Sequence, residues 1–268
     1  MLKVRDLTIS FRGGREAVRG ISFDMADGEV LGVLGESGSG KTVTALAIAG
    51  LLPRGSTETS GEIIFDGLDL LRAPREQIRK VQGIDIGMVF QEPLTSMNPT
   101  MRVGHQIEET LRIHRSGELS SEQMREFALR MIERVELPEP EQTYLKYPHQ
   151  LSGGQRQRAM IAAAAIGDPK LLICDEPTTA LDAMVQSQIL ALLRRINEKR
   201  GVGILFISHN LSVIRRLCRR VIVMNEGLIV EEGSVEDIYE HPKDDYTKRL
   251  IAGARRTGNA LPESCDGS

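Results

Sequence analysis

A glycine-rich segment near the N-terminus has the residue types of a phosphate-binding loop. GESGSGKT fits G-x-x-x-x-G-K-[ST] and lies between an apolar run and a helical pattern, the context that this motif requires. Lys41 would place its charge on the β and γ phosphates of a nucleotide, and the Thr42 hydroxyl would hold Mg²⁺ at the helix N-terminus. The residues expected to bind ATP are Gly35, Glu36, Ser37, Gly38, Ser39, Gly40, Lys41 and Thr42.

Two acids follow another apolar run. LLIC at 171–174 predicts a buried strand, and Asp175 and Glu176 come at its carboxyl end, where ligands bind in sheets of this kind. We expect Asp175 to hold the Mg²⁺ shell and Glu176 to polarise an attacking water. An acid pair alone would more often cap a helix, but together with a phosphate loop the pair favours nucleotide hydrolysis.

Two polar residues occupy the same kind of position. His209 ends ILFISH and Gln91 ends IGMVFQ, so both are expected at carboxyl ends of strands. A neutral imidazole at His209 could contact the γ-phosphate and order the water beside Glu176. The amide of Gln91 can reach both Mg²⁺ and that water. A lone histidine at a strand end is the simpler alternative for His209.

A second Ser-Gly-Gly element begins the segment LSGGQRQRAMIAAAA at 151–165. The Ser152 hydroxyl and the N–H groups of Gly153 and Gly154 would form an anion-binding cap at the start of a helix. We expect this cap to find no ligand in its own subunit, because the phosphates already have the loop at 35–42.

The elements that must position these residues follow from hydrophobic periodicity. Residues 2–11 and 16–25 alternate as two antiparallel strands around a Gly-Gly turn. Apolar runs predict further strands at 30–35, 86–90, 171–174, 204–208 and 221–224. A helix from Lys41 is expected to end at Pro53. Between Pro93 and Pro148 only helical patterns occur, one of them with Ser120 or Ser121 as its N-cap.

Composition narrows the class of protein. The 268 residues allow one large domain or two small ones, and a net charge of −3 with mixed signs gives no basic face for nucleic acid. Three scattered cysteines, Cys174, Cys218 and Cys265, fit neither a disulfide framework nor a zinc site. No apolar stretch approaches the roughly 18 residues that span a bilayer, so we expect a soluble chain that is neither secreted nor inserted.

The motifs together identify a family. The phosphate loop, Gln91, LSGGQ, CDE, TALD and His209 occur in the order of an ATP-binding-cassette ATPase, which the sequence resembles over about residues 2 to 250. The resemblance implies a P-loop NTPase fold of α/β class: a RecA-like wound sheet, an N-terminal antiparallel β subdomain and an inserted helical subdomain. The sequence patterns divide the chain into an ATPase domain at 1–252, with core 1–92 and 150–252 and helices at about 93–149, and a short tail at 253–268 that lacks periodicity and is expected to be disordered or loosely attached.

The family also implies how two sites are completed. Two cassettes pack head to tail, and each Ser-Gly-Gly closes over the nucleotide on the other subunit's phosphate loop, so that ATP joins the subunits. The implied contacts come from Ser152, Gly153, Gly154 and Gln155. Asp182 in TALD would link the two sites, and Phe11 would stack on adenine, although a phenylalanine that ends a strand is more often part of a core.

Several segments resemble a narrower group, the ATPases of oligopeptide, dipeptide and nickel importers. These segments are QEPLTSMNP, YPHQLSGGQRQR, DEPTTALD and HPKDDYTKRL. In that group the residues after Gln91 receive a helix of the membrane subunit, so Pro93, Leu94 and Met97 would form an apolar docking surface; core packing is the equal alternative. The cysteine-rich extension of longer members, which holds an iron–sulfur cluster, is not expected, because only Cys265 occurs there.

The implied function is ATP hydrolysis that powers import of peptides, nickel or a metal-chelate or opine-like solute, with ATP and Mg²⁺ as cofactors. The implied partners are a second cassette ATPase, identical or related, two transmembrane permease subunits and, indirectly, an extracytoplasmic solute-binding protein. The chain would lie on the cytoplasmic face of the bacterial inner membrane. Alternatives are a soluble cassette of translation or repair and an accessory cassette of a phosphonate-degrading C–P lyase complex.

Overall fold

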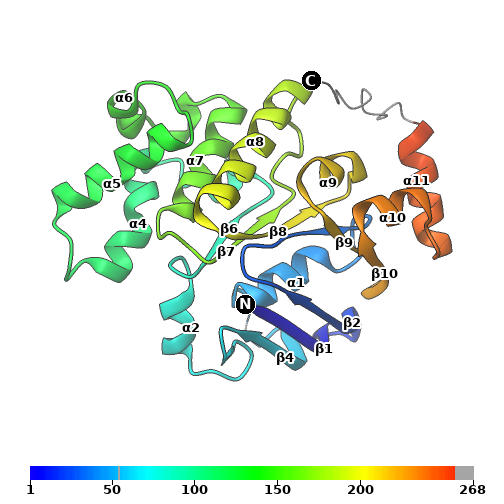
Figure 1. The fold of residues 1–268 in the computed structure, drawn as a ribbon. Helices are drawn as coiled ribbons and strands as arrows, with labels where there is room; N and C mark the ends of the chain where they lie inside the picture. The colour runs from blue at the N-terminus through cyan, green and yellow to red at the C-terminus, as the bar shows by residue number, and fades with distance from the viewer. Residues whose placement is uncertain (54, 257–268) are drawn as a thin grey trace.

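The computed structural model describes residues 1–53 and 55–256, which form two sheets with helices around them (Figure 1). The larger sheet has the strand order β10-β9-β3-β8-β7-β6, parallel except for the edge strand β10. Its strands are β3 Val30–Leu34, β6 Ile86–Val89, β7 Leu171–Asp175, β8 Gly203–Ser208, β9 Arg220–Asn225 and β10 Leu228–Ser234. The predicted parallel strands are confirmed, because runs of apolar residues can be buried on both faces of a sheet.

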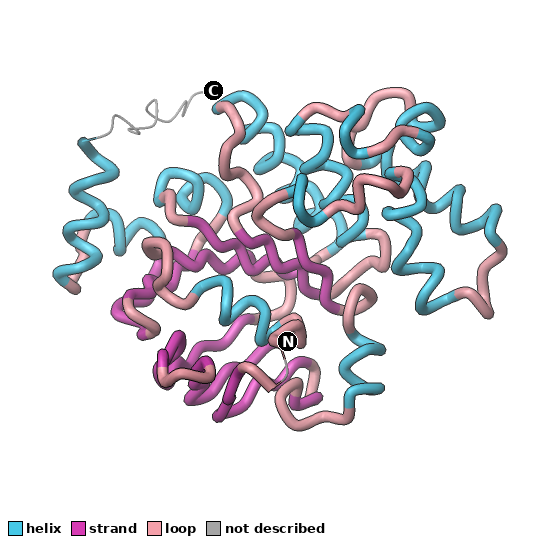
Figure 2. Tube along the Cα trace, turned by 180° about the vertical axis from the view of Figure 1, so that it is seen from behind, coloured by secondary structure: helices cyan, strands magenta, loops and turns pink. Residues whose placement is uncertain are grey.

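The smaller sheet is antiparallel, in the order β2-β1-β4-β5. It consists of β1 Leu2–Phe11, β2 Arg15–Met25, β4 Thr57–Phe65 and β5 Leu68–Asp69. Helix α1, Lys41–Ile48, lies between this sheet and the parallel one, as the view from behind shows (Figure 2). Apolar residues of both sheets and of α1 form one buried cluster, which includes Leu7, Ile48 and Ile173.

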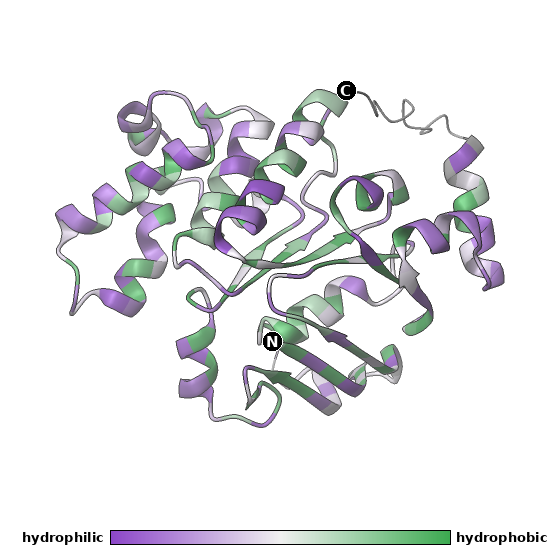
Figure 3. Cartoon of the chain, in the orientation of Figure 1, coloured by the Kyte–Doolittle hydropathy of each residue, from purple (hydrophilic) through white to green (hydrophobic). Residues whose placement is uncertain are grey.

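The opposite face of the parallel sheet is covered by helices, in the upper part of Figure 1. Alternate strand residues, such as Leu172, Cys174 and Phe206, pack there against a second apolar cluster. The helices on this side include α8 Ala183–Arg200 and α9 Leu211–Leu217. Figure 3 shows the consequence, green strands inside and purple residues along the outer surfaces of the helices.

The segment between β6 and β7 is helical throughout the described chain, as predicted. It comprises α3 Pro93–Ser96, α4 Val103–Arg115, α5 Ser121–Arg134, α6 Pro140–Leu145, the short 3₁₀ helix Pro148–Gln150 and α7 Gly153–Ala165. Ser120 is the N-cap of α5 and forms a capping box with Gln123: Ser120 Oγ accepts from Gln123 N at 3.2 Å, and Gln123 Oε1 accepts from Ser120 N at 2.8 Å. Of the two expected N-caps, Ser120 is therefore the one used.

Helix α1 is shorter than predicted. It ends at Ile48, and the chain turns at Gly50, whose φ of +68° is left-handed, so the helix stops before Pro53. The N–H groups of Ala49 and Gly50 bond to the carbonyls of Ala45 and Ala47, which satisfies the last turn. A Cβ at Gly50 would lie 2.8 Å from Ile78 Cγ2 of α2, Arg75–Val81. The left-handed turn at Gly50, and not Pro53, therefore ends this helix.

The C-terminal boundary also differs from the expected one. After α10, Val235–Glu240, helix α11 extends over Asp245–Arg256, which is past residue 252 where a disordered tail was expected to begin. Tyr246 and Ile251 are buried, and Leu250 packs against the same cluster. Because these residues lie on one face of α11, their packing holds the helix against the core. The rest of the expected tail, with Cys265, lies outside the described residues.

Two cysteines lie in the core. Cys174 and Cys218 are free and buried, as expected, and burial raises the pKa of both thiols. In residues 1–53 and 55–256, no helix combines the length and the apolar character needed to cross a membrane.

Candidate nucleotide site

The loop at 35–40 connects β3 to α1 and turns tightly at a glycine. Gly40 is the N-cap of α1 with φ +102°, in the left-handed region that side chains disfavour. A Cβ at Gly40 would also lie 2.5 Å from the carbonyl oxygen of Ala17 in β2. Glycine is required here on both grounds, and the loop opens at the start of α1, where helix N–H groups attract anions.

Lys41 is buried without a carboxylate partner. Its side chain is only 4 % exposed, and Nζ donates to the carbonyls of Gly35 and Glu36, each at 2.7 Å, and to Ser39 Oγ at 3.3 Å. Burial lowers the pKa of Lys41, while the negative charges of Glu176 and Asp175 oppose this shift. No ion pair to Lys41 exists in the part of the chain that the structure describes. A phosphate group would supply the missing countercharge.

Thr42 and Asp175 bring two oxygen ligands together. Thr42, in the first turn of α1, donates from Oγ1 to Oδ1 of Asp175 at the end of β7, at 3.2 Å. Asp175 is buried; burial raises the pKa of this carboxyl group, and the hydrogen bond from Thr42 partly offsets the shift. A hydroxyl and a carboxylate next to phosphate-binding N–H groups match the oxygen ligands that Mg²⁺ takes in nucleotide sites. The donor set therefore fits this ion.

Three polar side chains converge on one oxygen of Glu176. Oε2 accepts from Thr179 Oγ1 at 2.9 Å and from Gln91 Nε2 at 3.3 Å, and it lies 2.9 Å from Nδ1 of His209. Gln91, Glu176 and His209 follow β6, β7 and β8, which are neighbours in the sheet. Glu176 has φ +46°, and its N–H donates to Ile207 O at 3.0 Å. The carboxylate is thus held by groups that can also order a water molecule.

The structure brings most of the predicted catalytic and metal residues together at the carboxyl edge of the parallel sheet. Neighbouring strand ends supply Asp175, Glu176, Gln91 and His209, and the phosphate loop supplies Lys41 with Thr42. This arrangement can bind a triphosphate, hold a divalent cation and position water for attack on a phosphorus atom.

The second Ser-Gly-Gly element has a different environment. Ser152 caps α7 in a capping box: Ser152 Oγ accepts from Gln155 N at 3.3 Å, and Gln155 Oε1 accepts from Ser152 N at 3.0 Å. The capping box is local to the start of α7, so the expectation that this cap finds no ligand in its own subunit stays a prediction. The N–H groups of Gly153 and Gly154 come first in α7, where a helix provides no intrahelical acceptor, and the Ser152 hydroxyl proton remains available to a ligand.

Asp182 caps the next helix in the same neighbourhood. Its Oδ1 accepts from the N–H groups of Met184 and Val185, each at 3.0 Å, at the start of α8. A Cβ at Gly154 would lie 2.6 Å from Val185 Cγ1, so the small residue lets the starts of α7 and α8 pack closely. Within the described chain, the side-chain hydrogen bonds of Asp182, Ser152 and Gln155 stay at these two helix starts and do not reach the loop at 35–42.

Two other predicted residues are placed by their strands and helices. Phe11 is the last residue of β1, partly exposed and paired with Arg15 of β2, and the nearby Ala17 touches the phosphate loop at Gly40. Met97 is buried in the cluster of the helical layer, which is the core packing given as its alternative. The side chains of Pro93 and Leu94 lie outside the described part of the structure.

Tyr246 is a site residue that sequence reasoning missed. Its hydroxyl accepts a hydrogen bond from the N–H of Glu36 at 2.9 Å, across a separation of 210 residues. The other end of the same peptide group, Gly35 O, binds Lys41 Nζ. A planar peptide fixed at both ends cannot rotate, so α11 helps to hold the phosphate loop. The segment HPKDDYTKRL contains Tyr246 and resembles importer ATPases, but no local pattern in it predicts a contact with Glu36.

Comparisons with known proteins identify the family. The family described as "ABC transporter" matches this chain over residues 18–179, which is more than half of its length. The chain therefore belongs to the ABC transporter family, and it is an ATPase of the ATP-binding-cassette type.

Several relatives cover most of the chain. The peptidoglycan transport ATP-binding protein YejF of Agrobacterium fabrum is 47% identical over 94% of this chain and 46% of its own length. The probable peptide ABC transporter ATP-binding protein y4tR of Sinorhizobium fredii is 46% identical, covering 98% of this chain and 80% of its own. The oligopeptide transport ATP-binding protein OppD of Bacillus subtilis is 46% identical, covering 94% of this chain and 71% of its own length. The chain thus spans about half of the first relative and most of the others.

Solved structures share the fold. The cassette MJ0796, a dimer in a post-hydrolysis state bound to ADP and Pi, superposes with a TM-score of 0.78 at 28% identity, covering 88% of this chain and 99% of that one. CbiO1 of Clostridium perfringens, part of the ABC transporter complex cbiONQ, has a TM-score of 0.76 at 28% identity, covering 96% of each chain. The expected P-loop NTPase fold is confirmed.

Proposed function

We propose that this chain is the ATP-hydrolysing subunit of a peptide importer, bound to the cytoplasmic face of the bacterial inner membrane. The observation that carries the hydrolytic part is the convergence of Gln91, Thr179 and His209 on Glu176 Oε2. Peptide as the cargo is supported by relatives named for peptide, oligopeptide and dipeptide transport. None of these relatives is named for phosphonate metabolism, so the alternative accessory function lacks support.

The proposed chemistry is attack of water on the γ-phosphorus of ATP. Glu176 takes the proton of the water as the new P–O bond forms, and the bond between the γ-phosphorus and the bridging oxygen breaks to release ADP and phosphate. His209 orients the water and the γ-phosphate, and Lys41 leaves the carbonyls of Gly35 and Glu36 to neutralise the phosphates.

Mg²⁺ would be held by Thr42, Asp175 and Gln91, and when bound it shields phosphate charge. The phosphates would receive the backbone N–H groups from Gly35 to Thr42, and Phe11 would lie against adenine. The proximity of Ala17, near the end of the β1–β2 turn, to Gly40 supports the placement of Phe11.

We further propose that the site is completed by a second cassette, identical or related. Ser152, the N–H groups of Gly153 and Gly154, and the adjacent Gln155 would cap the γ-phosphate held by that partner, with Asp182 between the two sites. The support is the start of α7, where the N–H groups of Gly153 and Gly154 have no intrahelical acceptor and favour an anion. The cassette MJ0796, which is a dimer in its solved structure, supports this pairing.

Two permease subunits would form the membrane path, loaded by an extracytoplasmic binding protein. A groove of about 530 Å³ between the helical layer and the segments around β6 and after α1 supports a docking surface beside Met97. Its walls include Leu51, Phe90 and Ile113, apolar side chains that are 44, 38 and 67 % exposed. Such an exposed apolar groove fits a helix of a partner subunit.

We propose the domain division with one change. The core comprises 1–92 and 150 onward, with the helical subdomain at about 93–149, and the ATPase domain continues through α11 to Arg256. The support is the position of α3 to α6 between β6 and β7 and the packing of Ile251 into the core.

The test is capture of Glu176→Gln protein from solubilised membranes of its native cell with ATP and Mg²⁺. The substitution should trap the closed dimer, so a second cassette and two multi-spanning proteins should co-purify. Lys41→Ala protein, which should bind ATP poorly, is the matched control. Recovery of soluble enzymes of phosphonate metabolism and no permease would reject the importer and leave only the ATPase.

A further inference from the structure

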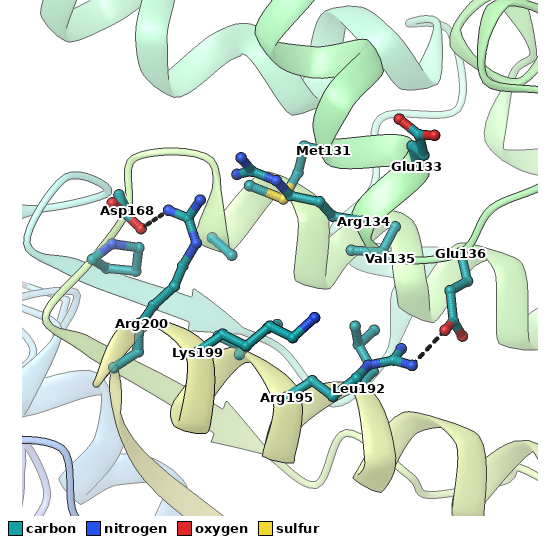
Figure 4. Close-up of a pocket in the computed structure, with 14 residues that line it drawn as sticks. Met131, Glu133, Arg134, Val135, Glu136, Asp168, Leu192, Arg195, Lys199 and Arg200 are labelled. Carbon is teal, nitrogen blue, oxygen red and sulfur yellow. Dashed lines mark hydrogen bonds and ion pairs between the residues drawn. The ribbon is translucent and has the colours of Figure 1, made fainter.

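A second cavity lies away from the nucleotide site and shares no residue with it. It has a volume of about 500 Å³ and opens between α5 of the helical layer and the C-terminal half of α8, with the turn at Asp168 and Pro169 closing one side. Figure 4 shows α5 and α8 on opposite walls. A volume of this size is typical of small-molecule sites.

Cations from both walls meet in this cavity. The lining contains Arg134 from the last turn of α5 and Arg195, Lys199 and Arg200 from α8. Cations are favoured near helix C-termini because they oppose the helix macrodipole. The fold brings two such termini together, and their charges therefore meet at one open cavity on the surface.

The carboxylates of the lining pair with only two of these four cations, Arg195 and Arg200. Glu136 accepts from Arg195 at 2.5 Å and is shared with Arg158 at 3.0 Å, and Asp168 pairs with Arg200. Glu133 also lines the cavity (Figure 4) but forms no ion pair with these cations among the described residues. Two of the three lining acids, Glu136 and Asp168, are thus already paired with arginines.

Arg134 and Lys199 are left over. Neither has a hydrogen bond or ion pair among residues 1–53 and 55–256. Burial lowers the pKa of the Arg134 guanidinium, and the like charges of Arg200 and Arg130 lower it further, while the negative charge of Asp168 opposes the shift. In Figure 4 the guanidinium groups of Arg134 and Arg200 lie near each other on the side of the cavity where Asp168 pairs with Arg200. An anion bound here would add the countercharge that Arg134 lacks.

The floor of the cavity is apolar. It is formed by side chains of α7 and α8 and of the chain that follows α5 and α8: Ala165, Leu192, Ile196, Val135 and Val202. Cationic groups above an apolar floor suit a ligand with one anionic end and one apolar part. Planar guanidinium groups bind phosphate oxygens through paired N–H donors, and a lysine adds a point charge.

We propose that this cavity binds a small organic phosphate, separately from ATP. Its phosphate contacts Arg134, Lys199 and Arg200, and its apolar part covers Leu192 and Ile196. A ligand held in this way touches α5 and α8 at once, so it joins the helical layer to the core of the cassette.

Phenyl phosphate is the probe, titrated calorimetrically into the full chain with saturating ADP and Mg²⁺ to occupy the nucleotide site. We expect one remaining site. Its affinity should fall at least tenfold when Arg134→Gln and Lys199→Gln are combined. The matched control combines Arg75→Gln with Lys80→Gln, the same loss of charge on the exposed face of α2, and should bind as the wild type does.

A second measurement locates the ligand without substitutions. Phenyl phosphate should slow acetylation of Lys199 by acetic anhydride and leave Lys80 unaffected in the same digest, as read by mass spectrometry. The proposal is overturned if ADP abolishes all binding of the probe, if both double variants bind equally, or if Lys199 is modified at an unchanged rate.

Discussion

Two helices of this ATPase begin with glycine-rich segments, and they differ in what surrounds them. The start of α1 buries Lys41 and faces Asp175 and Glu176 at the edge of the sheet. The start of α7 is closed by a capping box between Ser152 and Gln155, and no acid or buried lysine lies in its hydrogen-bond network within the described chain. A helix N-terminus supplies anion affinity in both places, but only the sheet supplies the groups that do chemistry at the first.

Replacing the carboxylate tests the first region most severely. Glu176→Gln should lower ATP turnover by about 10²- to 10⁴-fold, the contribution of a positioned general base, while nucleotide affinity is retained. Steady-state hydrolysis by the assembled transporter measures turnover. Glu198→Gln, an equal charge change on the outer side of α8, is the control, and equal activity of the two variants would exclude Glu176 as the base.

Mixing two inactive variants tests whether the start of α7 in one subunit completes the nucleotide site at the start of α1 in another. Ser152→Arg and Lys41→Ala should each be inactive alone. In a homodimer, an equal mixture should recover about a quarter of the wild-type activity, because half of the dimers contain one intact composite site of two. ATP hydrolysis after co-refolding or subunit exchange is the measurement. A mixture no more active than its components would show that α7 does not act across an interface.

Removing one hydroxyl tests the support of the phosphate loop by α11. Tyr246→Phe leaves the Glu36 N–H without its acceptor, and one neutral hydrogen bond contributes about 0.5–1.5 kcal/mol. We expect the KM for ATP to rise roughly 2- to 10-fold with little change in kcat, since the loop binds the nucleotide but does not react.

The control for this variant is Tyr239→Phe, which removes a hydroxyl from α10 while keeping the ring on which Arg215 and Arg255 stack. A fall in kcat with unchanged KM in Tyr246→Phe would show that the contact acts on the chemical step instead.

Alanine substitutions at the N-caps of α5 and α7 should have the smallest effects, and they compare the two capping boxes directly. Ser120 and Ser152 form the same capping box, on α5 and α7. Each Ser→Ala change should lower the free energy of unfolding by about 1 kcal/mol, measured by urea denaturation. Only Ser152→Ala should also lower ATPase activity. Equal activity of the two variants would assign a purely structural role to both caps.

Local sequence predicted much of the fold but missed particular strands. The parallel strands and the β1–β2 hairpin were correct because apolar runs and strict alternation are local signals. Strand β4 was missed because TETSGEIIF is polar over its first half, and its place depends on pairing with β1. Strand β10 was missed for a similar reason, since LIVEEGS carries two acids at the edge of the sheet.

For this protein, the sequence by itself determined the chemical groups of the nucleotide site, because each stands at a recognisable spacing beside a strand or glycine loop. Only the tertiary structure decided which groups meet. The contact of Tyr246 with Glu36 and the shared cavity of Arg134 and Lys199 join segments far apart in the chain. No local period relates such residues, since their distance depends on how sheets and helices pack.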